Sequence, residues 1–184
     1  MTDKDISIKY ILKFLEDDSK KSLLVKGYDN EAKLRVVLAC LDNKFKKGII
    51  RTSSMSDISS HINGAFNDNL LPHSVKSTTT YSLGRMSVKI NSYVTHTKSN
   101  PTGNEETFTL YHPVQTVLDK PDRYESFLGD LKKTQSRKII LITTNEWSID
   151  NFDIENHVDD VYFYSVENDN PQIMKNLRRN GAVS

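Results

Sequence analysis

The sequence has a single cysteine, Cys40, which excludes an internal disulfide and any zinc site built from several thiolates. It also lacks an apolar run near the roughly 20 residues that a membrane-spanning helix needs. Its longest apolar stretches, such as KIILIT, are far shorter. The opening residues, MTDKDISIKY, contain no basic segment leading into an apolar one, so we expect no export signal. Together these absences predict a cytoplasmic protein that does not associate with membranes.

An excess of charge of one sign is missing as well. Lys and Arg number 25 against 24 Asp and Glu, which leaves a formal net charge of +1. The whole molecule therefore has no general electrostatic attraction to nucleic acid or to anionic membranes, and any basic surface must be local. The 184 residues fit one domain with a substantial core, and we expect a single domain over 1–184.

In the first third of the chain, apolar residues recur at helical spacing in three segments. These segments are 6–18, 30–45 and 56–66, and two short apolar runs at 22–28 and 47–53 separate them. Runs of this length between helical patterns are typical of buried strands. The first third of the chain is therefore predicted to form helices and strands in alternation.

The middle of the chain has a different pattern. Residues 70–81 are rich in Ser, Thr, Pro and His without apolar periodicity and predict a loop. Apolar and polar residues then alternate from Met86 to Asn91 and again from Phe108 to His112. Alternation with a period of two predicts strands, so we expect an inserted β-hairpin over 84–113 with an exposed tip.

The last third returns to strands and helices. Residues 121–133 predict a helix, and 137–146 and 159–166 predict strands. A final helix begins at Pro171 after a cap at Asn170. This order predicts an α/β fold: a three-layer sandwich with a mainly parallel sheet flanked by helices, plus an inserted antiparallel β-hairpin.

A buried strand, a glycine and a helix follow one another at GYDNEAKL, residues 27–34. Phosphate-binding loops have this order and the pattern G-x-x-x-x-G-K-[ST], in which backbone N–H groups and the lysine bind phosphate and the hydroxyl binds magnesium. Gly27 and Lys33 stand at the right spacing, whereas Ala32 and Leu34 replace the second glycine and the hydroxyl. The stretch resembles a degenerate Walker A loop of the P-loop NTPase superfamily, of the RecA/AAA-like kind.

The resemblance extends to two later segments. FTLYHPV stands where the family has its second acidic strand, although His112 and Pro113 occupy the region of the expected magnesium-binding Asp. IILITTNE matches the strand whose tip has a polar sensor, here Asn145. The resemblance thus implies a phosphate site at Gly27, Lys33 and Asn145, with ATP and Mg²⁺ as the cofactors if binding is retained.

Charge at the loop argues against that retention. Asp29 and Glu31 lie inside it, and a carboxylate about 5 Å from a triphosphate costs on the order of 1–3 kcal/mol. Leu34 cannot ligate a metal. We therefore expect no catalytic residue, no metal site and no bound cofactor.

Two other kinds of site, a metal-dependent nuclease centre and a histidine metal site, have only partial patterns in the sequence. Metal-dependent nucleases of the PD-(D/E)xK type need an acid-x-Lys triplet on a strand, and the triplets here, Glu31-Ala32-Lys33, Asp42-Asn43-Lys44 and Asp130-Leu131-Lys132, fall on predicted helices. The five histidines are scattered, without the i, i+3 or i+4 spacing of metal ligands. The enzymatic alternative is a nucleotide-dependent or Mg²⁺-dependent enzyme of nucleic acid metabolism.

Local basic clusters supply candidate nucleic-acid contacts. Residues 44–47 include three lysines, and Arg178 and Arg179 end the last helix, where cations favour the helix dipole. The candidate contacts are Lys132, Lys133, Arg137, Lys138, Lys89 and Lys98. On the expected hairpin, Tyr93 and Tyr111 are candidate interface residues, because aromatic side chains are effective in contacts. We expect a non-catalytic interaction or assembly protein that binds a protein partner or its own copies, with nucleic acid as a further partner.

Overall fold

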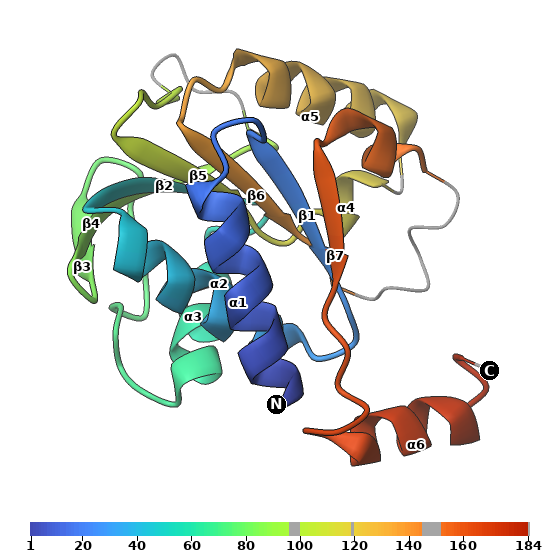
Figure 1. Cartoon of the computed structure of the whole chain (residues 1–184). Helices are drawn as coiled ribbons and strands as arrows, with labels where there is room; N and C mark the ends of the chain where they lie inside the picture. The colour runs from blue at the N-terminus through green and yellow to red at the C-terminus, as the bar shows by residue number, and fades with distance from the viewer. Residues whose placement is uncertain (96–99, 119, 145–151, 184) are drawn as a thin grey trace.

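The computed structural model describes residues 1–95, 100–118, 120–144 and 152–183, and these form one twisted sheet between two helical layers (Figure 1). The order in the seven-stranded sheet is β3-β4-β2-β5-β6-β1-β7. The strands are β1 (Ser22–Lys26), β2 (Lys47–Thr52), β3 (Thr80–Leu83), β4 (Met86–Ser92), β5 (Thr107–Tyr111), β6 (Lys138–Ile142) and β7 (Asp160–Phe163). All neighbouring pairs are parallel except β3 and β4. The α/β sandwich with a mainly parallel sheet is confirmed.

The helices divide between the two faces of the sheet. One face packs against α1 (Asp3–Glu16), α2 (Asn30–Lys44) and α3 (Ile58–Phe66), and the core on this side also receives Met174 of α6 (Pro171–Arg179). The other face packs against α4 (Gln115–Leu118), α5 (Pro121–Lys133) and the 3-10 helix η2 (Ile154–His157). Figure 1 shows α6 standing beside the main body, below β7.

Local sequence explains the helix boundaries. Thr2 begins α1 with a capping box: its hydroxyl accepts the N–H of Asp5, whose carboxylate accepts the N–H of Thr2. Asp57 stands at the start of α3, and Asn67 ends that helix in the left-handed conformation. In α2, the small buried Cys40 packs in the apolar core, as a lone cysteine on an apolar face is expected to do.

The expected hairpin over 84–113 is wrong in its pairing. Strands β4 and β5 both exist, but they lie on opposite sides of β2 and each is parallel to it. The antiparallel hairpin is instead β3 with β4, which meet at a turn through Gly84 and Arg85. Residues 70–79 form the expected loop, and β3 begins at Thr80. Alternation identifies a strand, but its partner depends on packing far away in the sequence.

Strands β4 and β5 also differ in how deeply their side chains are buried. Met86, Val88 and Ile90 of β4 are buried while Ser87 and Lys89 are exposed. Every residue of β5 is buried. The apolar side chains beneath α5 come mainly from β1, β5 and β6, and Arg51 near the end of β2 reaches α5 through Asp130. In the part of the chain that the structure describes, no helix is both long and apolar enough to cross a bilayer.

Candidate functional site

Strands β1, β5 and β6 end together at the carboxyl edge of the sheet, where open parallel sheets bind ligands. The turn after β1, the residue after β5 and the residues after β6 all lie at this edge. Gly27, Lys33 and His112, which occupies the region of the expected acidic residue, lie close together here, so this edge is the candidate site.

The turn after β1 is short. Strand β1 ends at Lys26 and α2 begins at Asn30, which leaves Gly27, Tyr28 and Asp29 between them. A carboxylate oxygen of Asp29 accepts the N–H of Ala32 at 3.0 Å, and the backbone oxygen of Asp29 accepts the N–H of Lys33 at 3.1 Å. The start of α2 is thus capped by a carboxylate from its own chain, at the place where a P-loop holds phosphate.

The backbone at position 27 explains why this residue is glycine. Its φ of +141° is rarely adopted by other residues, and a Cβ atom there would lie 2.6 Å from the backbone oxygen of Tyr164. The chain leaving β7 passes so close to this turn that only glycine fits. The glycine is therefore explained without a phosphate.

Lys33 points into the protein and not toward solvent. Its side chain is fully buried, and its ammonium donates to the backbone oxygen of Gly27 at 2.5 Å and to the backbone oxygen of Thr143. These bonds join the end of β1 to the end of β6. Asn145, the expected sensor, lies outside the described residues.

A small pocket opens beside this turn, and we refer to it as the histidine pocket. Its volume is about 150 Å³, and it lies between α2, α3 and the ends of β5 and β6. Its walls are Asn30, Glu31, Leu34, Ser60, His61, His112 and Thr144. A water molecule occupies about 30 Å³ of liquid, so the pocket has room for a few waters or one small polar group.

The two histidines face each other with ring centroids 5.5 Å apart in a T-shaped arrangement. Only 2% of His112 is exposed, and its Nδ1 has no hydrogen-bond partner within the described ranges. Burial lowers the pKa of His112 to about 3, with further contributions from nearby His61 and Lys33. His112 is therefore a neutral ring and cannot supply positive charge to an anion at physiological pH.

Gln115 and Thr144 are further polar residues at the carboxyl edge of the sheet. The side-chain oxygen of Gln115 accepts from the N–H of Thr144 at 2.5 Å and from its hydroxyl at 3.0 Å. The side-chain nitrogen of Gln115 is buried without a partner among the residues described. No group of three or more His, Cys, Asp or Glu in the described ranges could hold a metal ion. Hydrogen bonding to a small neutral group is the chemistry available here.

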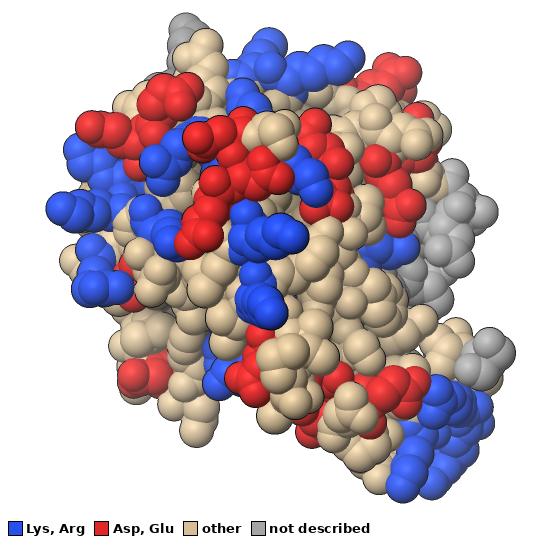
Figure 2. Space-filling view, viewed as in Figure 1, with Lys and Arg blue, Asp and Glu red and all other residues tan. Residues whose placement is uncertain are grey.

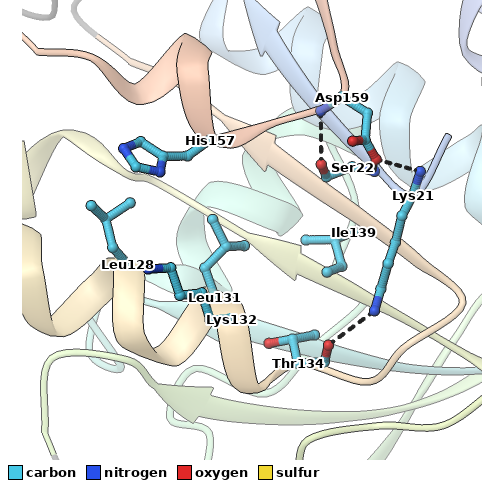
Figure 3. A pocket seen from close by; sticks show the side chains of 9 residues that line it. All are labelled: Lys21, Ser22, Leu128, Leu131, Lys132, Thr134, Ile139, His157 and Asp159. Carbon is cyan, nitrogen blue, oxygen red and sulfur yellow. Dashed lines mark hydrogen bonds between the residues drawn. The ribbon is translucent and has the colours of Figure 1, made fainter.

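A second hollow lies at the opposite, amino edge of the sheet, beneath α5 (Figure 3). Its volume is about 260 Å³. The Asp159 carboxylate accepts the backbone N–H groups of Lys21 and Ser22 at 2.7 and 3.0 Å, and the Lys21 ammonium donates to the backbone oxygen of Thr134 at 3.2 Å. These polar groups tie β1 to its neighbours, while His157 and Lys132 line the other side.

Lys138 is not a nucleic-acid contact, contrary to the sequence prediction. It is 2% exposed, and its ammonium donates to the backbone oxygens of Phe14 at 2.9 Å, Asp17 at 2.6 Å and Lys20. The ammonium also lies 4.6 Å from the centre of the Phe14 ring. Lys138 therefore satisfies the free carbonyls at the end of α1.

Tyr93 and Tyr111 do not form an exposed interface, so this prediction is wrong. Both are buried, and each ring contacts Phe127 of α5 with centroids 5.4 and 5.3 Å apart. The Tyr111 hydroxyl donates to Asp130 at 2.6 Å, and burial followed by the Asp130 charge raises the pKa of this tyrosine. Both rings face the α5 layer and belong to the core.

The acid-x-Lys triplets lie on α2 and α5, as expected. Their three carboxylates have different surroundings. Asp130 pairs with the buried Arg51 at 2.7 Å. Asp42 accepts the backbone N–H of Arg85 at the β3–β4 turn, and Glu31 lines the histidine pocket. The carboxylates are dispersed and do not converge as a nuclease site requires.

The other candidate cations are on the surface. Lys89, Lys132, Lys133 and Arg137 are exposed, and Lys98 lies outside the described residues. The Arg137 guanidinium lies 4.4 Å from the centre of the Phe45 ring, next to the lysines of 44–47. Lys132 of α5 lines the hollow at the amino edge, whereas Lys89 of β4 lines a different hollow. Sequence reasoning missed Arg85, which the hairpin turn places next to Asp42.

Comparison with known proteins gives no family for this chain. No protein-family model matches it, and no curated protein matches it.

Proposed function

We propose that this protein is a non-catalytic interaction protein on a degenerate P-loop-like scaffold, and that it acts by binding a partner without nucleotide. The observation that supports this most is the position of Lys33. Its ammonium is bound to the backbone oxygens of Gly27 and Thr143, inside the fold, while the Asp29 carboxylate caps α2. The Lys33 ammonium and the N–H groups at the start of α2, which would attract phosphate, both serve to stabilise the strand-to-helix turn.

The neighbouring positions support the same proposal. Leu34, at the position of the metal-binding hydroxyl, is 1% exposed and packs in the core. His112, after β5, is neutral and cannot replace a magnesium-binding carboxylate. The proposed scaffold therefore retains the strand, turn and helix of the resemblance without the charges that the reaction needs.

The test is the thermal stability of the protein with ATP and Mg²⁺. A ligand at 100 times its Kd would stabilise the native state by about 2.7 kcal/mol, and we expect no stabilisation. We also expect Lys33→Met to lower the melting temperature strongly, because it leaves two backbone oxygens buried without their ammonium partner. Lys9→Met, at an exposed lysine of α1, is the matched control and should leave stability nearly unchanged.

The opposite result would favour the enzymatic alternative. In a nucleotide-dependent enzyme, ATP with Mg²⁺ would stabilise the wild type, and Lys33→Met would abolish that stabilisation and any release of phosphate while the protein stayed folded.

A further inference from the structure

Two neighbouring hollows lie on the side of β2 and β4. The first has a volume of about 430 Å³ and is lined by residues of β2, β3 and β4 and of the segment 101–107. The second, of about 400 Å³, lies at the end of α2 beside the β3–β4 turn. Lys47 and Ser87 line both, so the two hollows lie side by side. We refer to the two hollows together as the basic groove.

Cations dominate the walls of the basic groove. Lys44, Lys46, Lys47, Arg85 and Lys89 line it, and Asp42 is the one acidic residue that does so in the described part of the chain. In Figure 2, Lys and Arg side chains gather at the left edge of the molecule, next to where Figure 1 shows β2 and β4. A protein with a net charge of +1 thus has a local excess of positive charge at this groove.

Three of the five cations have an acidic partner, and one of these pairs, between Arg85 and Asp42 at 3.9 Å, lies within the groove itself. Lys46 and Lys89 form no ion pair within the described ranges. Lys44 pairs with Glu16 at 2.7 Å and Lys47 with Glu106 at 4.0 Å, but both acids are largely exposed. Exposed pairs of this kind contribute little, so an anionic partner can replace them.

The fold holds the cations in a fixed pattern. Lys47 is opposite Ser87 and Ile49 is opposite Lys89, which places all four side chains on one face of the sheet. Asp42 accepts the backbone N–H of Arg85 at 2.9 Å and so fixes the turn at the groove. The groove is therefore built on strands and on a braced turn, which fix the backbone positions of its cations.

We propose that the basic groove binds single-stranded nucleic acid through its sugar-phosphate backbone. This inference rests on the proposed interaction function and names its partner. The groove offers several cations along a concave track, with the hydroxyl of Ser87 and the side chain of Asn104 as further hydrogen-bonding groups. Hollows of a few hundred Å³ accept one strand, whereas a duplex is a wide convex cylinder. No exposed aromatic ring lines the described walls, so binding depends on the backbone and not on base stacking.

The probe is a fluorescein-labelled oligonucleotide of about 16 nucleotides, as oligo(dT) and as oligo(U), with binding measured by fluorescence anisotropy. The test variant is Lys46→Glu with Lys89→Glu, two exposed lysines whose replacement spares the core. We expect at least about tenfold weaker binding and a salt dependence less steep by at least about 1.4 in log–log slope, the value for two lost phosphate contacts. The matched control is Lys132→Glu with Lys133→Glu on α5, which should bind within about twofold of the wild type.

Several results would overturn the inference. These are an absence of binding at low salt, an equal loss in both double variants, tighter binding of a duplex of the same length, or equal displacement of the probe by poly-glutamate. The last result would indicate an acidic protein as the partner. The stability test with ATP and the oligonucleotide test also distinguish the two proposals. Stabilisation by ATP with Mg²⁺ refutes the non-catalytic function. Failed oligonucleotide binding without such stabilisation refutes only nucleic-acid binding by the groove.

Discussion

His112 illustrates how one buried residue makes stability depend on pH. Its pKa is about 3 in the native state because of burial and the nearby His61 and Lys33, against 6.5 for an ordinary histidine. Between these two values the unfolded chain binds a proton that the native protein does not bind. The free energy of unfolding therefore falls as the pH drops below about 6.5, by up to about 1.4 kcal/mol per unit.

We predict that His112→Gln reduces this pH dependence. Between about pH 6.5 and 5, the wild type should lose roughly 1–2 kcal/mol more stability than the variant, measured by urea unfolding. His73→Gln, at an exposed histidine in the loop before β3, should follow the wild type. A stability difference between wild type and His112→Gln that stays constant over this range would contradict the prediction.

The candidate site was partly predictable at the residue scale. The sequence predicts a strand, a glycine turn and a helix at residues 22–45, and the carboxylates of Asp29 and Glu31 indicate a poor phosphate site. It does not predict where the Lys33 ammonium goes, because one acceptor is the backbone oxygen of Thr143, 110 positions away. The position of the Lys138 ammonium is equally hard to predict, because it donates to backbone oxygens of Phe14 and Asp17 at the end of α1, more than a hundred residues earlier. A buried cation and a surface cation look alike until the carbonyl groups around them are placed.

Helix α5 is held on the sheet by one polar network in addition to its apolar side chains. The Arg51 guanidinium of β2 pairs with Asp130 at 2.7 Å, and the same carboxylate accepts the Tyr111 hydroxyl of β5 at 2.6 Å. Arg51 is 2% exposed, so it depends on this partner. Removing one member of a buried pair leaves the other charge uncompensated, which costs more than losing both.

We predict that Asp130→Ala lowers the free energy of unfolding by about 3 kcal/mol. Adding Arg51→Met should recover part of that loss, because the unpaired guanidinium is then removed as well. A urea double-mutant cycle measures both effects, with Glu125→Ala at an exposed position of α5 as the control, expected within about 0.5 kcal/mol of the wild type. Additive losses from Asp130→Ala and Arg51→Met would show that the two side chains are not coupled.

At the scale of elements, the sequence predicts strands better than their partners. Met86, Val88 and Ile90 alternate with polar residues because Ser87 and Lys89 on the other face of β4 are exposed, and this alternation locates the strand correctly. Its neighbour β2 lies more than 30 positions earlier, and a crossover places β5 on the far side of β2. Local alternation contains no information on that crossover. The same exposed face is the one that presents Lys89 to the basic groove.

Across the whole molecule, the first and last helices are joined by a reciprocal pair of carboxylates. Asp3 at the start of α1 accepts the N–H groups of Asn168 and Asp169 at 2.8 and 2.9 Å. Asp169 in turn accepts the N–H groups of Asp3 and Lys4 at 3.1 and 2.8 Å. Burial works to raise the pKa of Asp3, but the hydrogen bonds from Asp169 and Asn168 hold it below its ordinary value. Segments about 165 residues apart thus cap each other.

We predict that Asp169→Ala loosens both ends of the chain together. The change leaves the N–H groups of Asp3 and Lys4 without their acceptor at the start of α1 and frees the segment that leads into α6, which contacts the core through Met174. Amide hydrogen exchange should therefore become faster in residues 3–9 and 170–180, while β1, β5 and β6 keep their protection, since the sheet core opens only in larger unfolding events. Asp18→Ala, at an exposed acid beyond the other end of α1, should change neither region. If exchange accelerates only near residue 169, the two helices open independently, and the paired carboxylates are two separate local caps.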